Sequence, residues 1–112
     1  MAKVIITNSL KEQVYKQFKK DSIKIFNLMK ALEKNPNKGK ILSSVAGIII
    51  KEIKYDSFRF YFITDGNKIK FSSIDELSSV VIKFIAMSDK KNQKEIITKV
   101  KNLLKTFGFD GF

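Results

Sequence analysis

The sequence of 112 residues contains no cysteine and no histidine, and it has a single proline. Without cysteine, disulfides and thiolate metal sites are excluded, and without histidine, imidazole ligands and histidine general bases are excluded as well. No apolar run approaches the roughly 20 residues that span a bilayer, and the first residues lack the charge order and cleavage site of a signal peptide. These absences predict a cytoplasmic protein that uses no metal and no cofactor.

Recognisable enzyme motifs are missing as well. The chain has no Gly-x-Gly-x-x-Gly loop, and Gly39-Lys40 lacks the preceding glycine of a phosphate loop and is followed by Ile41. Paired carboxylates for acid–base catalysis, nucleophile triads and zinc sites all need residues or spacings that this chain does not have. Most enzyme classes are therefore excluded.

Positive charge is abundant. The chain carries 22 Lys and Arg against 11 Asp and Glu, which gives a net charge of +11 at neutral pH. A surplus of this size in one small protein attracts polyanions. Arg59 is the only arginine, although the lysine-rich composition would by itself have supplied a lysine there. With 44% hydrophobic residues, the sequence predicts a single globular domain, residues 1–112, with one core.

The segment Ile48–Thr64 is rich in β-branched and aromatic residues, and it predicts two strands joined by a tight turn at Asp56-Ser57. Successive side chains of a strand point to opposite faces of the sheet. One face of the second strand is apolar and is expected to meet the core: Phe58, Phe60 and Phe62. The other face of that strand is mixed: Arg59, Tyr61 and Ile63.

Four polar side chains of this hairpin are expected on the same face: Glu52, Lys54, Arg59 and Tyr61. One interpretation is a solvated face with a cross-strand ion pair, which stabilises a protein only slightly. The other is a phosphate-binding and catalytic surface, because the planar guanidinium of Arg59 can contact two phosphate oxygens. Packing of Arg59 inward against a structural carboxylate would contradict the second interpretation.

Periodicity and turn residues predict the elements on both sides of the hairpin. Before it we expect a strand at 3–7, a helix capped by Asn8 or Ser9, a second helix from Asp21-Ser22 to about Lys34, a break at 35–39 and a connector at 41–46. After it we expect a turn at 65–67, a strand at 68–73, an ambiguous segment at 73–77, a strand at 80–87 and a last helix capped by Ser88 or Asp89 and ended by Gly108. The apolar stripe of the last helix is expected at Ile96, Val100, Leu103, Leu104 and Phe107. The aromatic tail 109–112 is expected to fold back on the domain or to meet a partner.

This order predicts an α+β fold. It has an N-terminal strand and two helices, an antiparallel twisted sheet of four to five strands and a C-terminal helix, with the helices covering one face of the sheet.

Four short motifs, in this order, resemble those of the RelE/ParE superfamily of toxins from type II toxin–antitoxin pairs, and its HigB-like, phage-derived branch in particular. The first is the Asn-Pro-x-x-Gly-Lys connector at 35–40, and the second is Glu52-Ile53-Lys54, where the family has Glu-Leu-Arg. The third is Phe58-Arg59-Phe60-Tyr61-Phe62, which matches an aromatic-Arg-hydrophobic-aromatic stretch. The fourth is Lys90-Lys91-Asn92-Gln93, which matches Lys-Lys-x-Gln near the start of the closing helix.

The resemblance implies a RelE-like fold and a ribosome-dependent mRNA endonuclease (an mRNA interferase) that is neutralised by an acidic antitoxin protein. In such an enzyme a ribose 2′-oxygen attacks the adjacent phosphate, which leaves a cyclic phosphate and a free 5′-hydroxyl. Carried over position by position, the expected catalytic residues are Lys54, Arg59, Tyr61, Lys90 and Lys91. Residues expected to bind the RNA around them are Lys51, Lys83, Gln93 and Lys94.

The chain departs from the family pattern at several places. It has no histidine and no tyrosine after Tyr61, Lys54 stands where arginine is usual, and Ser73–Ser79 is an insert between the last strands. Lysine cannot make the two-pronged phosphate contact of arginine. Two alternatives to an RNA-cleaving toxin therefore remain open. One is a non-catalytic relative that binds RNA or the ribosome, and the other is a ParE-like inhibitor of DNA gyrase.

Overall fold

The computed structural model describes residues 2–65 and 80–112, and it forms an α+β fold around a five-stranded sheet. Its strands are β1 (Lys3–Ile6), β2 (Lys40–Val45), β3 (Ile48–Tyr55), β4 (Phe58–Asp65) and β5 (Val81–Ser88). Its α-helices are α1 (Asn8–Phe18), α2 (Ser22–Lys30) and α4 (Gln93–Phe107). None of these helices is long and apolar enough to cross a membrane. The strand expected at 68–73 and the insert Ser73–Ser79 lie outside the described residues.

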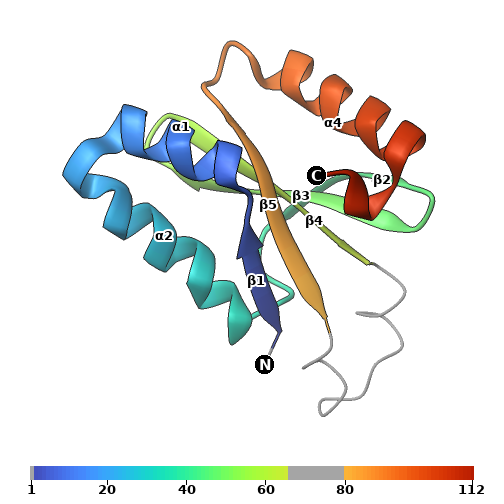
Figure 1. Ribbon diagram of the computed structural model, residues 1–112, viewed down its shortest axis with the longest axis horizontal. Helices are drawn as coiled ribbons and strands as arrows, with labels where there is room; N and C mark the ends of the chain where they lie inside the picture. Colours follow the sequence, from blue (N-terminus) through green and yellow to red (C-terminus); the bar gives the residue numbers. More distant parts are fainter. Residues whose placement is uncertain (1, 66–79) are drawn as a thin grey trace.

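The strands lie in the order β1-β5-β4-β3-β2 (Figure 1). Neighbouring strands from β2 to β5 are antiparallel, whereas β1 pairs with β5 in parallel. The predicted α+β class is confirmed, and the sheet formed by the described residues is mixed rather than wholly antiparallel. The parallel pair joins two strands that are far apart in the chain, because α1, α2 and three strands lie between β1 and β5. No local pattern in the sequence indicates the relative direction of such a pair.

The hairpin of β3 and β4 forms where the sequence predicts it, with Asp56 at φ 53° in its turn. The connector expected at 41–46 is wrong, because these residues form most of β2, which pairs with β3. A two-residue turn joins these strands, with Ala46 at φ 52° and Gly47 at φ 83°. Positive φ at both turn positions is the geometry that matches the twist of a tight hairpin. The isolated sequence 41–46 has weak alternation, so the pairing decides its structure.

The helices begin at slightly different residues from those expected. The N-cap of α1 is Thr7 rather than Asn8 or Ser9, and its side chain accepts a hydrogen bond of 3.4 Å from the Leu10 amide. Asp21 precedes α2 without a side-chain capping bond. Instead, the buried Ser22 hydroxyl donates to the carbonyl of Val14, which ties α2 to α1.

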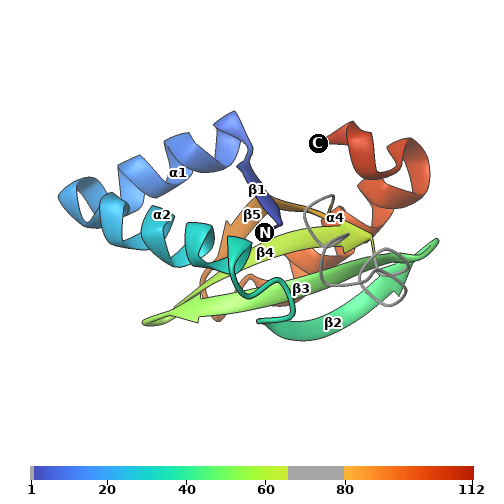
Figure 2. The same ribbon diagram turned by 90° about the horizontal axis from the view of Figure 1, so that it is seen from below.

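Helices cover both faces of the sheet, which corrects the expectation that they cover one. Figure 2 shows α1 and α2 lying together on one side of the sheet. Their buried residues join one core cluster with aromatic residues of the strands: Leu10, Val14, Ile25, Met29, Phe60, Phe62 and Phe84. A second cluster joins α4 to the opposite face: Ile50, Ile63, Ile85, Val100 and Leu104. The face of the hairpin opposite to Phe58, Phe60 and Phe62 is therefore also largely buried.

The C-terminal segment mostly follows the prediction. Gly108 ends α4 at φ 71°, and its amide donates to the Leu104 carbonyl at 2.9 Å. The tail folds back on the domain, where Phe109 and Phe112 pack against the second core cluster. Phe107, which is expected in the apolar stripe, is the last residue of α4 and is 64% exposed, so this part of the prediction is wrong.

We predict that Gly39→Ala destabilises the protein by about 1–3 kcal/mol more than Gly108→Ala does. Both glycines have positive φ, so an alanine costs backbone strain at either position. At Gly39 the new Cβ would also lie 2.7 Å from the ring of buried Phe62, whereas at Gly108 it would meet open space. Urea unfolding of the two variants measures the difference. Equal losses would show that the core around Phe62 accommodates the methyl group.

Candidate functional site

The register of β3 and β4 brings the predicted polar side chains together. Lys54 lies directly opposite Arg59, and Glu52 lies opposite Tyr61. On the far side of β4, Ser88 of β5 is the partner of Arg59. Residues that face each other across antiparallel strands share a face of the sheet, so these five side chains form one group.

Glu52 and Arg59 form an ion pair at the centre of this group. The side chain of Glu52 is 2% exposed and that of Arg59 is 13% exposed, and the Arg59 Nε lies 3.8 Å from Glu52 Oε2. This Nε is buried and has no hydrogen-bond partner among the described residues. Gln93 at the start of α4 donates to the same Glu52 oxygen at 3.4 Å. Arg59 thus packs inward against a structural carboxylate, which contradicts the interpretation of its guanidinium as an exposed phosphate-binding fork.

Tyr61 is fully buried, so its hydroxyl does not reach a bound RNA, which corrects its assignment as a catalytic residue. Its hydroxyl shares a hydrogen bond of 2.7 Å with the buried Ser88 hydroxyl. Burial raises the pKa of Tyr61, and the nearby charge of Glu52 raises this pKa further, while the Ser88 hydrogen bond and Arg59 act in the opposite direction. The phenol therefore stays protonated at neutral pH and supports the floor of the site.

Lys54, Lys90, Lys91 and Lys94 are the predicted cations that remain exposed. Lys90 and Lys91 leave the sheet just after Ser88, in the segment that leads to α4. Asp89 fixes this segment, because its Oδ1 accepts hydrogen bonds of 2.9 Å from the amides of Lys91 and Asn92. Asp89 therefore organises the turn before α4 rather than capping the helix itself, whose N-cap is Asn92.

Two predicted RNA-binding residues lie elsewhere and have structural contacts. Lys51 is on the opposite face of the sheet and 5% exposed, and its Nζ donates to the Asn37 carbonyl at 2.9 Å. Burial lowers its pKa. Lys83 donates to the main-chain oxygens of Phe109 and Phe112, each at 3.3 Å, and lies 5.0 Å from the centre of the Phe109 ring. Neither ammonium group is free to meet a phosphate in this structure.

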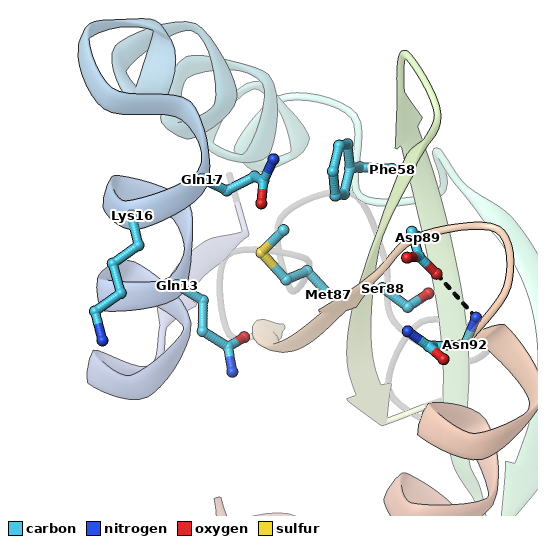
Figure 3. A pocket seen from close by; sticks show the side chains of 8 residues that line it. All are labelled: Gln13, Lys16, Gln17, Phe58, Met87, Ser88, Asp89 and Asn92. Carbon is cyan, nitrogen blue, oxygen red and sulfur yellow. Dashed lines mark hydrogen bonds between the residues drawn. The ribbon is translucent and has the colours of Figure 1, made fainter.

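A shallow pocket of about 350 Å³ lies at the same end of the sheet, and sequence reasoning missed it (Figure 3). It lies between α1, the start of β4 and the end of β5. Phe58, Met87 and Ser88 form part of its wall. No local pattern in the sequence indicates that the polar face of α1 lies beside a pocket. Within residues 2–65 and 80–112, no group of three or more metal-ligating side chains is present.

We predict that Tyr61→Phe lowers the free energy of unfolding by about 1–2 kcal/mol, since the buried Ser88 hydroxyl loses its partner. The pKa of Tyr61 is raised in the folded state. The contribution of Tyr61 to the free energy of unfolding is therefore complete below the pKa of the unfolded state, and it is lost as the pH rises through the pKa of the folded state. The variant should therefore lose less stability than the wild type in strongly alkaline solution. Thermal unfolding at several pH values measures this, and the lowered pKa of Lys51 affects both proteins equally.

An identical alkaline loss in both proteins would show that Tyr61 is not the titrating group. Absorbance of tyrosinate provides the control, because the chain has three tyrosines and Tyr15 is 57% exposed. The latest-titrating phenol should disappear from the titration of the variant.

Comparison with known proteins adds no identification. No family model, no curated protein and no solved structure matches this chain. The arrangement of Arg59, its exposed lysine neighbours and the pocket is therefore the basis for assigning a function.

Proposed function

We propose that this chain is the toxin of a type II toxin–antitoxin pair, which binds messenger RNA on the ribosome and cleaves it without a metal ion. The observation that supports this is the meeting of cations from three segments at one end of the sheet. Lys54 is the cross-strand neighbour of Arg59, and Ser88 on its other side leads directly into Lys90 and Lys91. Cations gathered in this way favour a phosphodiester, and the net charge of +11 favours a polyanion in general.

The reaction would use these cations for charge stabilisation and proton transfer. A ribose 2′-oxygen forms a bond to phosphorus while the bond to the 5′-oxygen breaks, so the products are a 2′,3′-cyclic phosphate and a 5′-hydroxyl. Arg59 would stabilise the additional negative charge on the phosphate oxygens. Of the predicted catalytic residues, Lys54, Lys90 and Lys91 are exposed and are the candidates for taking the 2′ proton and supplying one to the leaving oxygen.

The Glu52–Arg59 pair favours a second candidate, which is RNA or ribosome binding without cleavage. Glu52 offsets the charge of Arg59 and approaches its Nε, so only the remaining exposed part of the guanidinium can reach a phosphate. An acidic antitoxin would cover the same basic end of the sheet in either case. A gyrase-directed toxin has no such observation in its favour.

We predict that induced wild-type protein stops translation and cuts transcripts, leaving 5′-hydroxyl ends, and that Arg59→Ala reduces the cleavage rate about 10²–10³-fold. The reason is the loss of the one guanidinium beside the scissile phosphate. Mapping of transcript ends after induction measures it, and Lys20→Ala, an exposed cation on the α1–α2 side, is the matched control. Intact transcripts and normal translation with the wild type would contradict the proposal.

Cleavage of bound RNA, and not RNA affinity, separates the two candidates. Both expect binding that weakens steeply with salt, because phosphate contacts release counterions. Only the first expects cleavage of a bound message at any pH. DNA-damage signalling without RNA cuts would instead indicate gyrase as the target.

A further inference from the structure

We propose that the pocket beside Phe58 receives one base of a single-stranded RNA, so that the protein binds its substrate by a base as well as by phosphates. This inference depends on the proposed function for its choice of RNA as ligand. The pocket volume of about 350 Å³ is at the small end of the range for ligand sites and suits one flat ring system with its sugar (Figure 3). The pocket opens to solvent, as a site for one unit of a long chain must.

Two apolar side chains form one wall of the pocket. Figure 3 shows the ring of Phe58 and the thioether of Met87 turned toward the same space, and both side chains are half-buried. The Phe58 ring is held edge-to-face by Phe18, with ring centres 5.1 Å apart and planes at 75°. A ring fixed in this way is prepared for stacking, and RNA-binding proteins commonly recognise unpaired bases by stacking them on aromatic side chains.

Three carboxamides form much of the remaining rim: Gln13, Gln17 and Asn92. All three residues are exposed, and their side-chain carboxamides make no hydrogen bond within the part of the chain that the structure describes. Each carboxamide offers donors and an acceptor. This combination complements the edge of a nucleobase, which also presents donors and acceptors side by side.

The charges around the pocket indicate which part of a nucleotide enters it. The carboxylate of Asp89 lines the pocket and would repel a phosphate placed inside. Arg59 follows Phe58 in β4 with its side chain on the opposite face of the sheet, and Ser88 in the pocket wall is the strand partner of Arg59, so the two faces meet at this end of the sheet. Lys16 lies on the α1 side of the pocket. A base held against Phe58 would therefore leave its own phosphates outside, between the cations at the end of the sheet.

The test compares a six-nucleotide RNA with an abasic chain that has the same sugars and phosphates. Both carry 2′-O-methyl groups, so neither can be cleaved and the result does not depend on catalysis. Fluorescence anisotropy at low salt should show the wild type binding the chain with bases at least about tenfold more tightly, which is within the range for one stacked base. Phe58→Leu should remove this difference and leave the affinity for the abasic chain unchanged.

Because Phe58 also packs on Phe18, the exposed Gln17→Ala provides a variant that should leave the fold intact. It should change the relative affinity for the four homopolymers, whereas Asn102→Ala, an exposed carboxamide on α4 outside the pocket, should not. Equal binding of the two chains by the wild type would overturn the proposal, as would a free nucleoside monophosphate that binds as tightly as the six-nucleotide chain. Failure of cleavage on ordinary RNA, with the base preference intact, would overturn the endonuclease assignment alone.

Discussion

The carboxylate of Glu52 lies inside the protein, and the groups that balance its negative charge determine how the proposed site is arranged. Arg59 supplies a positive charge from the next strand at 3.8 Å, and Gln93 supplies a hydrogen bond from α4. A buried carboxylate that loses such partners costs several kcal/mol. The contact therefore holds β3, β4 and the start of α4 in one relative position. It also takes most of the guanidinium out of solvent, so the same interaction that positions Arg59 limits its access to a ligand.

The placement of helices on both faces of the sheet restricts where a polyanion can bind. One face meets α1 and α2, and the other meets α4 and the folded-back tail. Lys51 and Lys83 sit within strands, and they donate to the carbonyl of Asn37 and to the carbonyl of Phe109 in the tail, respectively. The exposed cations near Arg59 are Lys54, its cross-strand neighbour near the end of β3, and Lys90 and Lys91, where β5 ends and the chain turns toward α4. The proposed site is therefore an end of the sheet rather than one of its faces.

Sequence reasoning was most successful where the structure is local. The hairpin of β3 and β4, its turn and the register of Lys54 with Arg59 follow from alternation and turn chemistry over 17 residues, Ile48–Thr64. It failed at β2, because a short strand with weak alternation depends on its partner. It also failed at Tyr61, whose polar hydroxyl suggested solvent although its ring fills a buried position beside Ser88.

The sequence alone determined the surplus of positive charge, the segregation of strands and helices, and the group of polar side chains on one side of the central hairpin. These properties depend on composition and on the two-residue period of a strand, both of which are visible in a short stretch. Only the tertiary structure decided which of these groups reach solvent. Burial depends on elements far apart in the chain, so α4 converts Glu52 into an internal counter-charge and α1 creates a pocket beside Phe58.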